Sequence, residues 1–247
     1  MEQVFKRPES LKDNPFRLCP GCGHSLVHRL IAQSIDELGI RERVIGIAPV
    51  GCAVFAYDYF NFDIIECAHG RPPSVATALK RVHPEAIVFS YQGDGDLAAI
   101  GTAEIVHTAN RGENLSVFFI NNATYGMTGG QMAPTTLLKQ RTTTCQKGKR
   151  IATEGYPLKV SEMLATLDGA VFVARSSLDN VNNVLHTKKL VKKVFENQMN
   201  NKGFSFLEIL SPCPTDWHMQ PVDSLKWISS EMAGVFKNGI FKDVERP

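Results

Sequence analysis

An acidic, glycine-rich turn runs Gln92-Gly93-Asp94-Gly95-Asp96. The glycines on both sides of Asp94 let the backbone turn tightly and let a ligand approach it closely. A helix is expected to begin directly after this turn, and the free N–H groups at its start favour a diphosphate. A carboxylate does not bind phosphate by itself, but magnesium bridges carboxylate and diphosphate oxygens. The turn therefore predicts a metal-bridged diphosphate site.

A pair of asparagines, Asn121-Asn122, ends a later apolar run, and Asn122 lies 28 residues after Asp94. That length fits one helix and one strand, which would bring the chain back beside the acidic turn. The side-chain oxygen of Asn122 and a backbone carbonyl near Thr124 could then complete the shell of the cation. Either motif alone is a common turn or strand end, but the two at this separation predict a cofactor site.

Four of the six cysteines lie in turn-like settings. Cys19 and Cys22 belong to Cys-Pro-Gly-Cys, a spacing that can aim both thiolates at one metal. Cys52 and Cys213 each follow an expected strand, and the remaining two, Cys67 and Cys145, lack this setting. Spacing alone does not choose between a tetrahedral zinc ion and a [4Fe–4S] cluster, because both accept four thiolates.

The elements that must position these residues alternate between strand-like and helix-like patterns. Short runs rich in β-branched and aromatic residues predict strands at 44–48, 64–67, 86–91, 115–121, 170–174 and 204–210. Apolar i, i+3, i+4 spacing predicts helices within 27–38, 74–82, 97–109, 161–167 and 181–195. This alternation predicts an α/β doubly wound, mostly parallel sheet forming a single domain over 1–247, with its site in the loops after the strands.

Composition narrows the class of protein. The chain has 247 residues, of which 43% are hydrophobic, and its formal net charge is +2. Near-balanced charge gives no electrostatic reason to expect nucleic acid or an anionic membrane. No segment approaches the roughly 20 apolar residues of a membrane span, and residues 1–8 hold no apolar run of signal-peptide length. We therefore expect a cytoplasmic protein, in which clustered thiols bind metal rather than pair.

The glycine turn together with Asn121-Asn122 resembles the diphosphate-binding signature of thiamine-diphosphate enzymes. The stretch Asn122-Ala123-Thr124-Tyr125-Gly126-Met127-Thr128-Gly129-Gly130-Gln131 is similar to β subunits of 2-oxoacid:ferredoxin oxidoreductases. The resemblance implies that Asp94 and Asn122 bind Mg²⁺ through their side chains and Thr124 through its carbonyl. The residues then expected to contact the cofactor are Val50, Gly51, Cys52, Ala53, His69, Gly93, Gly95, Asp96, Gly126, Met127 and Thr128.

In the same family, the cluster ligands come from a Cys-Pro-x-Cys-Gly turn, a Gly-Cys turn and a late Pro-Cys. These match Cys19, Cys22, Cys52 and Cys213, so the resemblance implies one [4Fe–4S] cluster. Oxidising a decarboxylated 2-oxoacid with ferredoxin requires one-electron steps, which zinc cannot carry. His24, which follows Cys22, faces either the cofactor or the cluster.

The resemblance also implies the reaction and the partners. A 2-oxoacid and coenzyme A would give acyl-CoA and CO₂, with electrons passing through the cluster to ferredoxin. The glutamate that activates thiamine has no convincing candidate in this chain, and the family places it on an α subunit. We expect no catalytic side chain of that kind here, an obligate α partner, and further γ and ferredoxin-like δ subunits.

Two segments bear on which 2-oxoacid is the substrate. Residues 212–219 and the Tyr125–Gly130 loop look most like the branched-chain, 2-oxoisovalerate branch, with 2-oxoglutarate as the alternative. Lys139 and Arg141 could recognise the second carboxylate of 2-oxoglutarate or could be surface charges. Two rival classes explain only part of the sequence. A non-oxidative thiamine enzyme leaves the four cysteines unexplained, and a zinc-stapled interaction module leaves the Asp94 and Asn122 motifs unexplained.

Overall fold

The computed structural model of the chain describes residues 6–245. The N-terminal segment that argued against a signal peptide therefore lies largely outside the described residues. The expected α/β fold is confirmed. Within residues 6–245 a seven-stranded sheet has the order β2-β1-β3-β4-β6-β5-β7. Its strands are β1 Val44–Ala48, β2 Asp63–Glu66, β3 Ile87–Gly93, β4 Ser116–Asn121, β5 Ala170–Ser177, β6 Phe204–Leu210 and β7 Gly239–Asp243.

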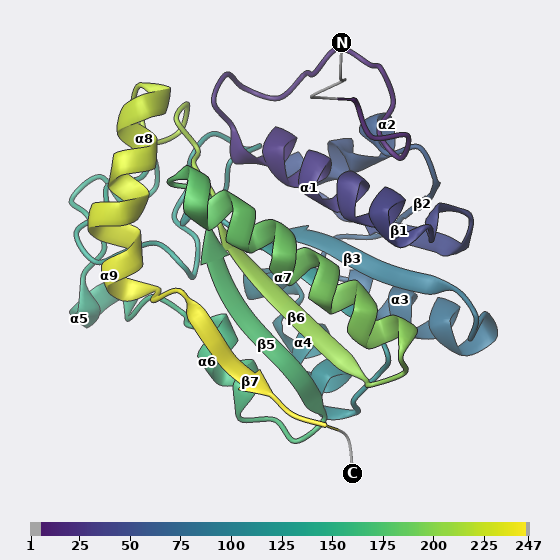
Figure 1. Cartoon of the computed structure of the whole chain (residues 1–247). Helices are drawn as coiled ribbons and strands as arrows, with labels where there is room; N and C mark the ends of the chain where they lie inside the picture. Colours follow the sequence, from purple (N-terminus) through teal and green to yellow (C-terminus); the bar gives the residue numbers. More distant parts are fainter. Residues whose placement is uncertain (1–5, 246–247) are drawn as a thin grey trace.

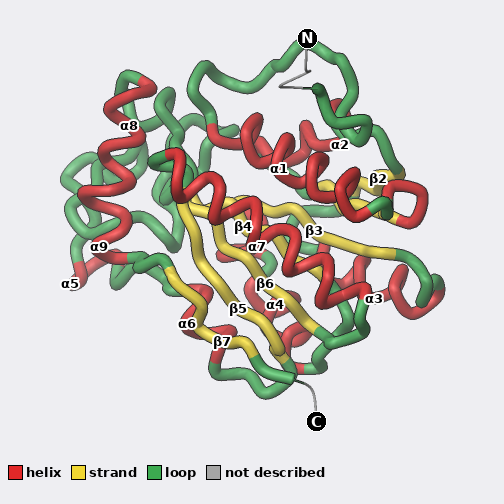
Figure 2. Tube along the Cα trace, in the orientation of Figure 1, coloured by secondary structure: helices red, strands yellow, loops and turns green. Residues whose placement is uncertain are grey.

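Helices cover both faces of this sheet (Figures 1 and 2). The longer helices are α1 Gly23–Leu38, α3 Pro72–Val82, α4 Thr102–Asn110, α6 Val160–Ala165, α7 Val181–Met199 and α8 Pro221–Trp227. Short helices complete the set at α2 Ala56–Tyr59, α5 Ile151–Glu154 and α9 Ala233–Val235. Helices α1 and α7 lie together on one face, and α3, α4 and α6 lie behind the other. The fold is therefore a three-layer, doubly wound arrangement.

The central strands are buried on both faces, as their continuous apolar runs predicted. Every residue of β4, β5 and β6 is buried, whereas the edge strand β2 is mostly exposed. Six strands run parallel, and β7 joins β5 in the antiparallel sense. Strand β7 was not predicted from the sequence, because its alternating, half-exposed residues lack the buried-strand pattern.

Two differences from the sequence prediction affect the site. The helix expected over 97–109 begins as a π-helical turn at Asp96–Ile100, and α4 starts only at Thr102. A wide turn of this kind is frequent at functional sites. A second π-helical turn, Ile228–Met232, links α8 to α9 in a C-terminal segment for which no helix was predicted.

The sheet topology creates one crevice. Strand β1 leads to β2 on one side, and its other neighbour, β3, leads to β4 on the opposite side. The loops after β1 and β3 therefore leave the sheet in opposite directions. Such a switch point at the carboxyl ends of parallel strands is where open α/β sheets bind ligands.

Candidate functional site

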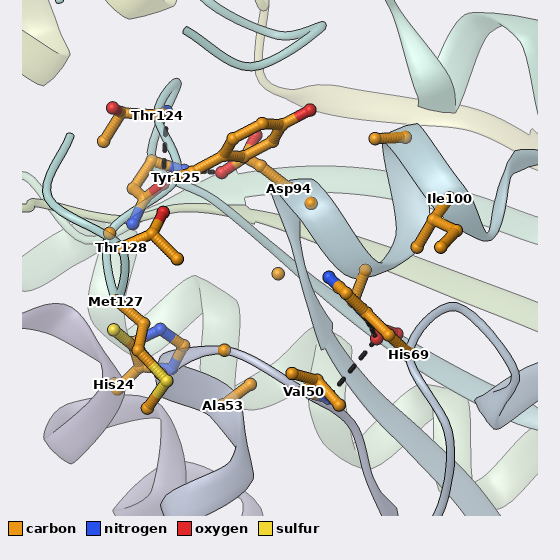
Figure 3. Close-up of a pocket in the computed structure, with 18 residues that line it drawn as sticks. His24, Val50, Ala53, His69, Asp94, Ile100, Thr124, Tyr125, Met127 and Thr128 are labelled. Carbon is orange, nitrogen blue, oxygen red and sulfur yellow. Dashed lines mark hydrogen bonds and ion pairs between the residues drawn. The ribbon is translucent and has the colours of Figure 1, made fainter. Parts of the chain in front are cut away.

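A cavity of about 350 Å³ opens at this switch point. Figure 3 shows its labelled side chains, with Asp94, Thr124 and Tyr125 at one end and Val50 and His69 on another side. All of the residues predicted to hold the diphosphate, the cation or the cofactor line it. They are Val50, Gly51, Cys52, Ala53, His69, Gly93, Asp94, Gly95, Asp96, Asn122, Thr124, Gly126, Met127 and Thr128.

Asp94 lies buried at the end of β3, where two neighbours hold its carboxylate. The backbone N–H of Asn122 donates to Oδ2 over 2.9 Å, and the hydroxyl of Thr135 donates to Oδ1. Burial raises the pKa of Asp94 to about 7, although both hydrogen bonds act to lower it. A buried carboxylate with no cation beside it is costly to ionise, and a bound divalent ion removes that cost. This environment fits a cation ligand.

The candidate oxygens from the neighbouring strand end lie close to Asp94. In the orientation that best satisfies its surroundings, the NH₂ group of Asn122 donates to Asp94 Oδ2 over 2.6 Å and to the Thr124 carbonyl over 2.7 Å. A half-turn of the amide would place its oxygen at the same point, where a cation could take the place of the two donated protons. The strand pairing of β3 with β4 produces this convergence, because their carboxyl ends lie side by side. Carboxylate, amide and carbonyl oxygens form the hard donor set that Mg²⁺ prefers.

The loop that presents Thr124 is held by its other carbonyls. The indole Nε1 of Trp217 donates to the Asn122 carbonyl over 3.0 Å, and the hydroxyl of Thr136 donates to the Ala123 carbonyl over 2.7 Å. Two of three successive carbonyls are therefore engaged by side chains. The third, on Thr124, remains on the side of Asp94 and Asn122.

Asp96 has a different role from its neighbour. Its buried carboxylate accepts hydrogen bonds from the Gly70 N–H over 2.8 Å and from the Gln92 side chain over 2.6 Å, and it contacts His69 Nδ1 at 2.6 Å. These contacts tie the loop after β2 to the loop after β3. With Nδ1 committed to Asp96, the other ring nitrogen of His69 is left to face the cavity beside Gly95.

His24 closes the inner end of the cavity. Its Nδ1 lies 2.6 Å from the hydroxyl of Tyr91, and both side chains are buried. Burial lowers the pKa of His24 to about 4 and raises that of Tyr91 well above its ordinary value. The imidazole of His24 is therefore neutral, and its Nδ1 shares a hydrogen bond with the phenol of Tyr91.

The four predicted cluster cysteines line one neighbouring cavity of about 240 Å³. Cys19 and Cys22 come from the turn before α1, Cys52 from the loop after β1 and Cys213 from the loop after β6. The two other thiols, Cys67 and Cys145, do not line it. Among residues 6–245, no three His, Cys, Asp or Glu side chains converge to hold a single metal ion. What the structure shows is four thiols around a common space.

Burial raises the pKa of Cys22 to about 12 and that of Cys52 to about 11, and it raises the pKa of Cys213 further. Thiols in such a setting ionise only when cationic metal neutralises them. Asp216 contributes to the same cavity, and its Oδ2 accepts from Cys213 Sγ over 3.2 Å. The donor set and its burial fit an iron–sulfur cluster.

The two cavities adjoin. They share His24, Cys52, Asn122, Gly126 and Met127 in their walls. A Cβ atom on Gly126 would lie 3.3 Å from both Cys52 Sγ and Asp216 Oδ2. The absence of a side chain at Gly126 therefore lets the Thr124–Thr128 loop pass between the two sites.

Several residues that line the larger cavity or orient its side chains were not predicted from the sequence. Ala99, Ile100 and Tyr125 also line the larger cavity, and Thr135 holds Asp94 from a loop 41 residues further along the chain. Ile100 enters the wall because the π-helical turn places it there, which a regular helical pattern did not indicate. Lys139 and Arg141, considered either for a second carboxylate or as surface charges, are both exposed, and neither lines the cavity.

Comparison with known proteins places this geometry in context. Residues 50–209 match the thiamine pyrophosphate enzyme, C-terminal TPP binding domain family. The chain is 44% identical, over 98% of its length, to ketoisovalerate oxidoreductase subunit VorA of Methanothermobacter thermautotrophicus, and 45% identical to that subunit of Methanothermobacter marburgensis. It spans 53% and 51% of these two relatives, about half of their length.

Two further relatives are matched over more of their own length. The chain is 33% identical to 2-oxoglutarate synthase subunit KorB of Methanocaldococcus jannaschii, covering 94% of this chain and 89% of that one. A solved 2-oxoglutarate:ferredoxin oxidoreductase from Magnetococcus marinus shares the fold with a TM-score of 0.79 at 23% identity. That match covers 99% of this chain and 87% of the other.

Proposed function

This chain belongs to the 2-oxoacid:ferredoxin oxidoreductase family as a β subunit with a thiamine pyrophosphate-binding domain, and we propose that it forms half of an oxidative decarboxylase active site. In this proposal a 2-oxoacid and coenzyme A yield acyl-CoA and CO₂, and the electrons leave to ferredoxin. We also propose that the enzyme is cytoplasmic. Among residues 6–245 no helix has both the length and the apolar character needed to cross a membrane.

The observation that carries the proposal is the convergence of Asp94, Asn122 and Thr124 at the switch-point cavity. We propose that their three oxygens hold Mg²⁺, which in turn holds the diphosphate. When bound, thiamine diphosphate supplies the nucleophilic carbon needed to decarboxylate a 2-oxoacid. Because Nδ1 of His69 faces the Asp96 carboxylate, its other ring nitrogen would donate to a diphosphate oxygen only when the ring carries both protons. Nε2 of His24, the ring nitrogen not bonded to Tyr91, would be left to meet a polar group of the bound cofactor.

The cysteine cavity supplies the oxidative half of the proposal. Cys19, Cys22, Cys52 and Cys213 would hold a [4Fe–4S] cluster, which accepts electrons one at a time. Because the two cavities share part of their walls, electrons would cross only the Gly126 loop and the Cys52 turn. This shared wall favours an oxidoreductase over a non-oxidative thiamine enzyme.

A partner subunit is part of the same proposal. The acidic residues lining the larger cavity are Asp94 and Asp96, and both are committed to contacts within the chain. A glutamate to activate the aminopyrimidine ring would then come from an α subunit facing this cavity. Exposed apolar side chains at the cavity, Ile100 at 51% and Met127 at 45%, suit such a covering partner. Further γ and ferredoxin-like δ subunits remain expectations from the family.

The cavity wall also favours one substrate class. No Lys or Arg is among the described residues that line it, whereas Val50, Ala53, Ile100 and Met127 give it an apolar side. A second carboxylate, as in 2-oxoglutarate, would find no cationic side chain from this chain, whereas a branched alkyl group would be accommodated. We therefore propose 2-oxoisovalerate or a similar branched-chain 2-oxoacid, in agreement with the name of the VorA relatives.

The test is an anaerobic assay of the protein purified with its natural partners. Coenzyme A-dependent reduction of ferredoxin should be measured with 2-oxoisovalerate and with 2-oxoglutarate. We expect kcat/KM at least about tenfold higher for 2-oxoisovalerate, since a binding difference of about 1.4 kcal/mol suffices for that ratio. Reduction with neither substrate would overturn the proposed reaction. A preference for 2-oxoglutarate would overturn the substrate proposal alone.

A further inference from the structure

A polar network is buried beneath the loop that holds Asn122. Asn121 precedes it at the end of β4, and alternation along a strand turns neighbouring side chains to opposite faces. The fully buried Asn121 amide makes two hydrogen bonds. Its Nδ2 donates to Glu208 Oε1 over 2.7 Å, and its Oδ1 accepts from the backbone N–H of Ala123 over 3.0 Å. Asn121 therefore joins Glu208 to the backbone of the candidate cation loop.

The bond to Ala123 stabilises an unfavourable backbone turn. Ala123 has a φ of 56°, in the left-handed region that non-glycine residues rarely adopt. Such a conformation costs about 1 kcal/mol or more and persists only where surrounding contacts hold it. Here Asn121 holds the N–H of Ala123 and Thr136 holds its carbonyl. This turn directs the following Thr124 carbonyl toward Asp94 and Asn122.

Glu208 is itself fixed from the side opposite Asn121. It lies fully buried in β6, next to Arg175 of β5 in register. Its Oε2 lies 2.8 Å from Arg175 Nε and accepts from the hydroxyl of Ser161 over 2.5 Å. With Ser161 hydrogen-bonded to Oε2 and the Arg175 guanidinium paired beside that oxygen, Oε1 is left for Asn121. The direction of the Asn121 amide, and with it the acceptor offered to Ala123, follows from this arrangement.

The Arg175–Glu208 ion pair is better explained as a means of orienting the Asn121 amide than as a source of stability. Taking Arg175 and Glu208 out of water costs about as much as their attraction returns, so a buried pair adds little net stability. Arg175 also keeps a second carboxylate, because it pairs with the partly exposed Glu162 at 2.5 Å. Without Glu208, Arg175 would therefore still have a carboxylate partner in Glu162. The contact that only Glu208 makes is the one to Asn121.

We propose that Glu208 is a positioning residue for the Mg²⁺–diphosphate site, acting through Asn121 on the turn at Ala123. The inference rests on the proposed function, since it assumes that Asp94, Asn122 and Thr124 bind the cation. Glu208 does not line the cavity. Its carboxylate sets the Asn121 amide so that the loop oxygens are aligned before the cation arrives.

The primary variant is Glu208→Gln. A glutamine amide that directs its oxygen toward Arg175 and Ser161 presents its NH₂ group to the Asn121 Nδ2 donor, so one contact is lost. The matched control is Glu162→Gln, which removes a carboxylate from the same arginine without touching Asn121. Affinity for Mg²⁺ at saturating thiamine diphosphate should be measured by calorimetry on the full chain with its copurifying partners, together with iron content.

We expect Glu208→Gln to weaken Mg²⁺ binding about 10- to 100-fold, the usual effect of losing an outer-shell partner. Glu162→Gln should stay within about twofold, and iron content should be unchanged in both. Asn121→Ala leaves the Arg175–Glu208 pair intact and should weaken Mg²⁺ binding similarly, so it carries the test if Glu208→Gln does not fold. Combining the two substitutions should add little beyond Asn121→Ala alone, because that substitution already removes the amide through which Glu208 acts.

Unchanged Mg²⁺ affinity in Glu208→Gln, or the same loss in Glu162→Gln, would overturn the inference. Independent effects that multiply in the double variant would overturn it as well. Failure of the proposed function gives a different result, in which the unaltered protein itself does not bind Mg²⁺ with thiamine diphosphate.

Discussion

The larger cavity, proposed to hold the diphosphate, adjoins the smaller cavity lined by the four cysteines, but the two are built in different ways. The first takes its candidate cation ligands from the ends of two adjacent parallel strands, β3 and β4, and hydrogen bonds already hold the Asp94 carboxylate in place. The second collects Cys19, Cys22, Cys52 and Cys213 from segments far apart in the sequence. The sheet positions the first site, whereas the second forms where three separate loops lie side by side.

This difference bears on what each site needs in order to be complete. Asp94 has donors on both carboxylate oxygens even without a cation, and its pKa stays near neutrality. The buried cysteine thiols have pKa values raised to about 11 or higher, so they require metal before they become thiolates. The diphosphate site should therefore be preorganised, and the cysteine site should depend on its metal.

Asp94→Ala should have the largest effect on the diphosphate side. Losing this direct candidate ligand should weaken Mg²⁺-dependent binding of thiamine diphosphate by more than about 100-fold, beyond the usual effect of an outer-shell change. Iron content should stay near that of the unaltered protein. Asp63→Ala, at an exposed carboxylate of β2, is the matched control. Unchanged cofactor affinity in Asp94→Ala would show that the ligand assignment is wrong.

Cys22→Ala tests the other side of the comparison. It should remove most of the iron while thiamine diphosphate still binds within about tenfold, because Cys22 lines only the smaller cavity. Cys67→Ala, at a cysteine outside that cavity, should keep its iron. Iron and cofactor can be measured on the same samples. Loss of both together in Cys22→Ala would contradict the separation of the two sites.

Thr135→Val should have a smaller effect. The hydroxyl of Thr135 orients Asp94 without lying among the candidate ligands, so its loss should weaken Mg²⁺ binding about tenfold. Calorimetric titration with Mg²⁺ at saturating thiamine diphosphate measures this directly. An affinity equal to that of the unaltered protein would mean that the strand ends alone orient Asp94.

A different kind of effect is expected in the pH dependence of the metal-free protein. Burial raises the pKa of Asp94 from 3.8 to about 7, so between these values the folded chain holds a proton that the unfolded chain has released. The resulting contribution to stability is complete below the unfolded pKa and is lost as pH rises through the folded pKa. Stability should therefore fall toward pH 7, by at most about 1.4 kcal/mol per pH unit from this group.

Urea unfolding in the presence of a chelator, at several pH values, compares the unaltered protein with Asp94→Asn. The difference between their unfolding free energies isolates this carboxyl from other titrating groups. A flat difference across the range would show that Asp94 is ionised in the metal-free chain.

The sequence predicted those parts of the site that depend on strand ends. Asp94 and Asn122 could be paired because adjacent parallel strands bring their carboxyl ends together. Cys52 and Cys213 could be placed because each follows a parallel strand at the same edge of the sheet. Thr135 and Tyr125 could not be assigned to the site in this way, because the conformation of the loop between β4 and α5 decides which of its side chains turn back toward the cavity. Ile100 depends on a π-helical turn that the apolar spacing did not indicate. Lys139 and Arg141 were considered from sequence proximity, but the chain carries them away from the cavity.

The most direct test of the account is the composition of the protein purified without oxygen together with its natural partners. Iron, zinc and thiamine diphosphate should be measured on one sample, with its visible spectrum. We expect brown protein with about four irons and about one thiamine diphosphate in this chain. Colourless protein with stoichiometric zinc, or brown protein that binds no thiamine diphosphate in the presence of Mg²⁺, would contradict it.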